Sequence, residues 1–354
     1  MQHRIESLDG LKFMCAILIM IYHYIAVFSV DLQGVLKIFG LFGVIGDDIF
    51  FMLSGFLVQS TYKLKLVENK CTGISFIKKR LIKVYPPFLL SLVLGVIISG
   101  ISEKLLGEIC VLKVSVENIF FSLTMTNDFF SADKSLVHHP FGSGLWFVCS
   151  LFFLYCIYYV LIKITKKDDF LLCICILTLI FYGQYIIDIR GNGFISYQMG
   201  RSITPFFVGT FVYELKEKVY GLKKIVVFSF FTLIFLSISI VESFGLGDYE
   251  KVFRLFVNPI VLLTIIYIKP ISLLFSRFSN ISRKLSMAVY FTNVNVFHLM
   301  RIILKYNKVN INYNNIIFFS LSILIEFFVA LIWLVFFDEK IFVKMRNFLG
   351  NQTL

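Results

Sequence analysis

Lys12 and His23 are the residues whose types and spacing could do chemistry. They lie eleven positions apart in the apolar run over residues 11–30. At about 100° per helical residue, eleven steps make three turns plus roughly 20°, so both side chains share one face, about 16 Å apart along the axis. An imidazole can act as a general base at neutral pH, and a cation can hold a phosphate. A membrane helix that carries both is expected to turn this face inward.

The composition indicates a chain that crosses a membrane many times. Of its 354 residues 58% are hydrophobic and only 16% are charged, too few polar side chains to cover a soluble surface. We therefore expect an all-α integral membrane protein, a bundle of about ten transmembrane helices. The predicted spans lie near residues 11–30, 36–60, 84–102, 143–163, 170–188, 201–215, 223–241, 253–269, 286–304 and 315–337.

The net charge of +12 indicates topology rather than nucleic-acid binding. With the N-terminus placed in the cytoplasm, most of the 34 Lys and Arg fall on the inner side, which is what the positive-inside rule requires. Both termini are therefore expected in the cytoplasm, and no nucleic acid is expected as a partner. The seven Cys show no pattern typical of metal ligands, so we expect no metal.

The second and third predicted spans carry further candidates. Asp47 and Asp48 lie at the outer mouth of the second, where they are solvated, cap the start of the following helix or have a functional role. The following Ser-Gly-Phe at positions 54–56 could let two helices approach closely. The basic segment 76–88 supplies Arg80 and Lys83, which are either topology charges or a cationic rim for phosphates. Its two prolines, Pro86 and Pro87, are expected in the first turn of the third span.

Polar residues inside the later spans give weaker signals. Arg201 is equally consistent with a ligand contact and with a membrane-surface anchor. Glu326 lies in the middle of an apolar span, where an unpaired carboxylate is costly. It is either protonated, paired with a basic residue or part of the cavity, and we favour a structural pair. Trp146 is more typical of packing than of sugar binding. His298 lies inside the ninth span and is the main rival of His23.

Several of these segments together resemble the membrane-bound acyltransferase 3 family, in the same order along the chain. RIESLDGLKFMCAILIMIYHY is similar to the first helix of the family, with Lys12 where Arg is commoner. Lys83 likewise replaces an Arg, Leu151 stands where some branches have Glu, and Asn293 replaces a His. The other segments that carry the resemblance are DDIFFMLSGFL with Asp48, Phe50, Phe51, Ser54, Gly55 and Phe56, KKRLIKVYP, GLWFV with Trp146, and KLSMAVYFTN with Tyr290.

The resemblance implies transfer of an acyl group, most often acetyl, from cytoplasmic acyl-CoA to a hydroxyl of a surface or lipid-linked polysaccharide. It implies no bound cofactor, since acetyl-CoA is a co-substrate, and a multi-pass location in a bacterial cytoplasmic membrane. His23 would be the general base or a transient acyl carrier, and Asp48 would orient it or bind the sugar. Lys12, Arg80 and Lys83 would hold the donor. The remaining candidates for the motifs or the cavity are Ser54, Gly55, Phe56, Trp146, Arg201, Tyr290, Asn293 and Glu326.

Residues 1–340 are expected to form this transmembrane domain, and residues 341–354 a short basic cytoplasmic tail. Two other classes of function stay open. A transporter or flippase could export a glycan or a lipid-linked intermediate through the same kind of helix bundle. The departures at Lys12 and Asn293 also fit an inactive scaffold of a glycan-assembly complex.

Overall fold

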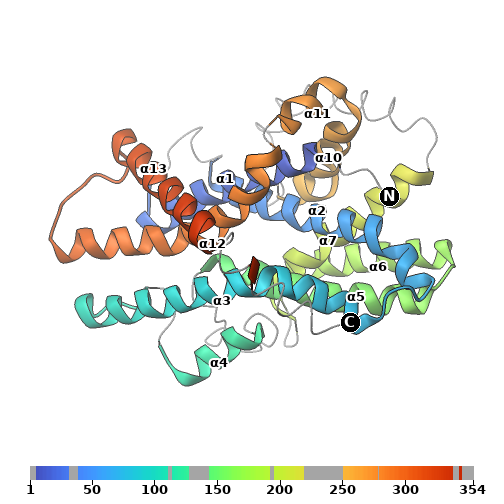
Figure 1. The fold of residues 1–354 in the computed structure, drawn as a ribbon, viewed down its shortest axis with the longest axis horizontal. Coiled ribbons are helices and arrows are strands. Elements are labelled where there is room, and N and C mark those ends of the chain that lie inside the picture. Colours follow the sequence, from blue (N-terminus) through green and yellow to red (C-terminus); the bar gives the residue numbers. More distant parts are fainter. Residues whose placement is uncertain are drawn as a thin grey trace.

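The computed structural model describes residues 5–31, 39–110, 114–126, 143–191, 195–218, 250–277, 279–337 and 343–344. These residues form eleven α-helices and contain no strand. In Figure 1 the long helices run side by side, with α10 and α11 on one side of the bundle and α4 on the opposite side. The helices are α1 (Ser7–Phe28), α2 (Phe39–Val67), α3 (Gly73–Leu106), α4 (Val116–Thr124), α5 (Trp146–Thr165), α6 (Asp169–Asp188), α7 (Tyr197–Lys218), α10 (Asn258–Tyr267), α11 (Lys269–Ser276), α12 (Ser279–Tyr306) and α13 (Ile316–Trp333).

Seven of the described helices are long and apolar enough to cross a membrane, so the protein is a multi-pass membrane protein. They lie at Ser7–Phe28, Phe42–Val67, Gly73–Leu106, Trp146–Thr165, Asp169–Asp188, Lys284–Tyr306 and Ile316–Phe337. The expected span 253–269 is part of a helix pair that bends by 87° between Tyr267 and Lys269, and it makes an eighth crossing if the pair is one span.

The other two of the ten expected spans are not among these seven or eight. Residues 201–215 do form a helix, as part of α7, but its polar residues keep it below the hydropathy of a typical span. Residues 223–241 lie outside the described residues, as does nearly all of the predicted tail 341–354. The cytoplasmic placement of the termini stays a prediction.

The expectation for Pro86 and Pro87 is wrong, because α3 begins thirteen residues before them and both prolines lie inside it. The Thr72 side chain caps the helix by accepting a hydrogen bond from the backbone N–H of Ser75. The basic segment is therefore the first part of a continuous helix of 34 residues. Arg80 and Lys83 therefore lie on α3, the helix that continues into the bundle.

Helices α2 and α7 touch backbone to backbone through two glycines. A Cβ added at Gly55 would lie 1.9 Å from the carbonyl oxygen of Phe206, and one added at Gly209 would lie 1.9 Å from that of Met52. Only glycine permits such an approach, which is what the small-residue interpretation of the Ser-Gly-Phe segment predicts. Helix α1 packs against both α2 and α12. The face that carries Lys12 and His23 therefore points into the interior of the bundle.

Candidate functional site

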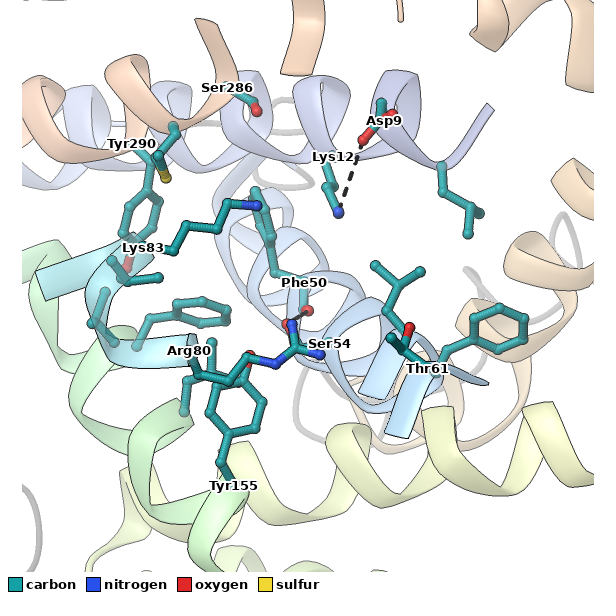
Figure 2. Close-up of a pocket in the computed structure, with 18 of the residues that line it drawn as sticks. Asp9, Lys12, Phe50, Ser54, Thr61, Arg80, Lys83, Tyr155, Ser286 and Tyr290 are labelled. Carbon is teal, nitrogen blue, oxygen red and sulfur yellow. Dashed lines mark hydrogen bonds and ion pairs between the residues drawn. The ribbon is translucent and has the colours of Figure 1, made fainter. Parts of the chain in front are cut away.

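A cavity of about 1400 Å³ lies between α1, α2, α3, α5, α7 and α12. Its wall combines aromatic and aliphatic side chains with charged ones, and it includes Ser54 and Phe56 of the Ser-Gly-Phe segment. The Ser54 hydroxyl donates to the Phe50 carbonyl at 2.9 Å, and the Phe56 ring packs edge-on against Tyr213. In Figure 2, the labelled side chains of Lys12, Phe50, Arg80 and Tyr290 point into this space from different helices.

The three residues predicted to hold a donor all line this cavity. Lys12 reaches it from α1, and Arg80 and Lys83 reach it from α3 (Figure 2). Lys12 forms a weak ion pair with Asp9, with 3.9 Å between its Nζ and the carboxylate oxygen. The Arg80 guanidinium lies over the ring of Tyr62 at 4.5 Å from its centroid, which fixes its position by cation–π attraction.

Two further cations, which the sequence did not single out, line the cavity. Lys216 comes from α7 and Lys284 from α12. In the sequence they are indistinguishable from the other positive charges at inner helix ends, and only the fold brings them to the same space. Five cationic side chains from four helices thus surround one cavity, an arrangement suited to an anion with several phosphates.

His23 lies beyond this cavity, buried at the contact between α1 and α12. Its Nδ1 is 2.6 Å from Oδ1 of Asn293. The amide nitrogen of Asn293 donates to the carbonyls of Val289 and Tyr290, so its oxygen is the atom that faces the imidazole. Because that oxygen can only accept, Nδ1 must carry the proton, and Nε2 keeps its lone pair. The imidazole is thereby held in the tautomer that a general base needs.

Gly144 leaves space next to the reactive edge of this imidazole. A Cβ added at Gly144 would lie 3.3 Å from Cε1 and 4.0 Å from Nε2 of His23. The carbonyl of Gly144 accepts a hydrogen bond from the hydroxyl of Tyr290, which also lines the cavity. Tyr290 and Gly144 therefore connect the wall of the cavity to the histidine.

Asp48 and His23, the two predicted catalytic residues, have different partners. Asp48 is buried, and its Oδ2 accepts a hydrogen bond from Nε of Arg254 at 3.0 Å. The partner of His23 is Asn293 instead. Oδ1 of Asp48 and Nη2 of Arg254 are buried without a hydrogen-bond partner within the described residues. Arg254 lies in a π-helical turn, Phe253–Val257, a local geometry that is frequent at functional sites.

Asp47, Arg201 and Trp146 form a second polar group nearby. Nη2 of Arg201 is 3.7 Å from Oδ2 of Asp47, and its guanidinium lies over the Trp146 ring at 5.5 Å from the centroid. Nε and Nη2 of Arg201 are buried and make no hydrogen bond to the described residues. The contact between Arg201 and Asp47 is thus too long for a hydrogen bond, so Nε and Nη2 of Arg201 can still donate to a ligand.

The remaining candidates are less directly placed. Glu326 is fully buried, and its partner is a hydroxyl rather than a basic group, with 2.6 Å between Oγ1 of Thr292 and its Oε1. His298, the rival of His23, is also buried on α12, and its Nδ1 has no hydrogen-bond partner among the described residues. Neither residue lines the cavity that holds the five cations.

The helices and the site define a membrane protein with a basic cavity that leads toward a buried histidine. A family model described as an acyltransferase domain, that of the acyltransferase 3 family, matches residues 5–336. Since this is nearly the whole chain, the protein belongs to the acyltransferase 3 family, which confirms the resemblance seen in the sequence. It is a membrane acyltransferase, and membership implies an acyl donor. No curated protein and no solved structure is significantly similar to the chain.

Proposed function

We propose that the protein is an O-acyltransferase that moves an acetyl group from cytoplasmic acetyl-CoA to a hydroxyl of a surface or lipid-linked polysaccharide. The observation that carries this proposal is the continuity of the site. Tyr290 lines the cavity that holds the five cationic side chains, and its hydroxyl bonds to the glycine next to Cε1 and Nε2 of His23.

The cations favour a donor that carries phosphates. Arg80, held by two aromatic rings, presents a planar guanidinium, and Lys12 and Lys83 add point charges from two other directions. Guanidinium and ammonium groups bind phosphate oxygens through charge-assisted hydrogen bonds, which are stronger than neutral ones. A coenzyme A thioester has several phosphates and a long uncharged arm that can extend along the apolar wall toward His23.

The proposed reaction uses Nε2 of His23 as general base. Nε2 takes the proton of the acceptor hydroxyl while its oxygen attacks the thioester carbonyl carbon. The C–O bond forms, the C–S bond breaks, and the thiolate leaves as a thiol after taking the proton back from the imidazole. Asn293 keeps Nδ1 protonated throughout by accepting its hydrogen bond. The same geometry allows His23 to carry the acyl group transiently.

The second polar group, formed by Asp47, Arg201 and Trp146, suits a hydroxyl-rich acceptor. Asp47 and Arg201 offer an acceptor and unused donors, and so do Asp48 and Arg254. With the positive charges of the inner loops in the cytoplasm, the donor cavity opens inward in a bacterial cytoplasmic membrane. The acceptor then approaches from the outer half.

The experiment compares the acetyl content of surface polysaccharide from cells with and without the gene, and with single variants. His23→Ala should reduce acetylation to the level of the deletion while the protein still inserts. His298→Ala is the matched control, since it removes a second buried imidazole from the same region, and it should retain acetylation. Normal acetylation by His23→Ala would refute the mechanism. Export of the polysaccharide that depends on the gene but not on acyl-CoA would indicate a transporter instead.

A further inference from the structure

Three aromatic side chains of the cavity wall pack against one another, and one of them, Tyr290, bonds to the glycine next to His23. They are Phe50 of α2, Phe147 of α5 and Tyr290 of α12, and all three line the cavity. Their ring centroids are 5.6 Å (Phe50–Phe147), 5.7 Å (Phe147–Tyr290) and 6.1 Å (Phe50–Tyr290) apart, with tilted planes. These are contact distances for aromatic pairs, so the three rings form one closed triangle.

The ring triangle is connected to the reactive edge of the imidazole through Tyr290 and Gly144. Tyr290 donates its hydroxyl hydrogen to the Gly144 carbonyl, and the position that a Cβ of Gly144 would occupy lies 3.3 Å from Cε1 and 4.0 Å from Nε2 of His23. Asn293 lies one helical turn after Tyr290. Its side-chain oxygen accepts the hydrogen bond from Nδ1, on the opposite edge of the His23 ring. A thioester that extends from the cavity toward Nε2 along this connection brings its carbonyl and acyl group next to these three rings.

The space at the triangle is firmly bounded. The ring of Phe51 packs behind Phe147 with 4.2 Å between centroids, and it also contacts Trp146. All of these side chains except Phe50 are buried. Because close-packed interiors resist added methylene groups, a longer acyl chain has to displace a ring that is backed by another ring.

We propose that Phe50, Phe147 and Tyr290 set the length of the acyl group that the enzyme accepts, and that they restrict it to acetyl. The inference rests on the proposed transfer from acyl-CoA, and it adds the residues that determine donor specificity. A shorter side chain at the triangle should create room for two more methylene groups next to His23.

The test measures CoA release in membranes that contain the protein, with polysaccharide as acceptor. Acetyl-CoA and butyryl-CoA are supplied as donors in separate reactions. The readout is the ratio of the butyryl rate to the acetyl rate, which cancels differences in expression and folding. Wild type should favour acetyl strongly. Phe147→Ala should raise the ratio by about tenfold or more, which is the usual worth of one or two methylene groups in a fitted pocket.

Two further variants keep the test decisive. Phe147→Leu fills most of the packed volume and should raise the ratio by a smaller factor than Phe147→Ala. Tyr213→Ala enlarges the same cavity from α7, where Tyr213 packs on Phe56 rather than on the triangle, and should leave the ratio unchanged. An unchanged ratio in both Phe147 variants, or an equal rise in Tyr213→Ala, would overturn the specificity role alone. Absence of transfer by wild type with either donor would refute the proposed function itself.

Discussion

The basic cavity and the histidine site differ in how their polar groups are satisfied. In the cavity, charged side chains come from four helices and are partly exposed, and the ion pair between Lys12 and Asp9 is loose, at 3.9 Å. At His23 the groups are neutral and buried, and the imidazole is fixed by a hydrogen bond of 2.6 Å. Accessible charges from several helices suit the binding of a large anion, whereas a buried neutral base in a fixed tautomer suits proton transfer. The two regions are therefore expected to control different kinetic constants.

The largest effect that would sharpen this comparison is expected from Asn293→Leu. Without an acceptor for Nδ1–H, His23 is no longer held in the tautomer with a free Nε2, and we expect turnover to fall by about 100-fold or more. The Michaelis constant for the donor should change little, because Asn293 does not line the cavity. The measurement is acetyl-CoA turnover per amount of inserted protein, as a function of pH.

Asn295→Leu provides the matched control. Asn295 is also buried on α12, but its amide donates to the carbonyl and the hydroxyl of Ser91 on α3. Its loss should lower the thermal stability without a specific loss of turnover. Equal losses of turnover in both variants would mean that Asn293 is only a packing residue.

An intermediate effect is expected at the cavity. Arg80→Ala and Lys83→Ala should each raise the Michaelis constant for acetyl-CoA by about tenfold, since a hydrogen bond to a charged group contributes roughly 1.5 kcal/mol or more. Turnover at saturating donor should be nearly preserved, and the difference from wild type should shrink at high salt. The control is Lys79→Ala, because Lys79 belongs to the same basic segment but is exposed and does not line the cavity. If Arg80→Ala and Lys83→Ala lowered turnover without changing the Michaelis constant for acetyl-CoA, the distinction between the two regions would be wrong.

The smallest effect is expected from Gly144→Ala. The new Cβ would lie 3.3 Å from Cε1 of His23, which is close enough to shift the imidazole by a few tenths of an ångström. We expect turnover to fall by about threefold, because catalytic geometry is sensitive to such shifts. Gly100→Ala on α3 is the control, since nothing lies within 4 Å of a Cβ at that position. A normal rate for Gly144→Ala would show that the approach to Nε2 is wider than the structure indicates.

Helical periodicity and local charge predicted part of this site. They placed Lys12 and His23 on one inward face and made Arg80 and Lys83 candidates for a cationic rim, because these features need no knowledge of distant contacts. Asn293 drew attention only as a departure from the family pattern. Its contact with His23 joins positions 270 residues apart, which periodicity in a single sequence cannot reveal.

Arg254 shows a second limit. In the sequence it is one more positive charge at the end of a predicted span, whereas in the structure it is fully buried and pairs with Asp48 across 206 positions. Similarly, Pro86 and Pro87 suggest a helix start because proline lacks an N–H group. The helix nevertheless continues through them, since Thr72 already caps an earlier start and the neighbouring helices pack along its length.

The most direct test of the division between the two regions is a measurement on one variant. Purified His23→Ala is titrated with acetyl-CoA by calorimetry, and its release of CoA in the presence of acceptor is followed in the same preparation. We predict an affinity for acetyl-CoA equal to that of wild type, because His23 does not line the cavity, together with no release of CoA above background. Wild-type release of CoA by this variant, or loss of acetyl-CoA binding, would contradict the assignment of binding to the cavity and of proton transfer to His23.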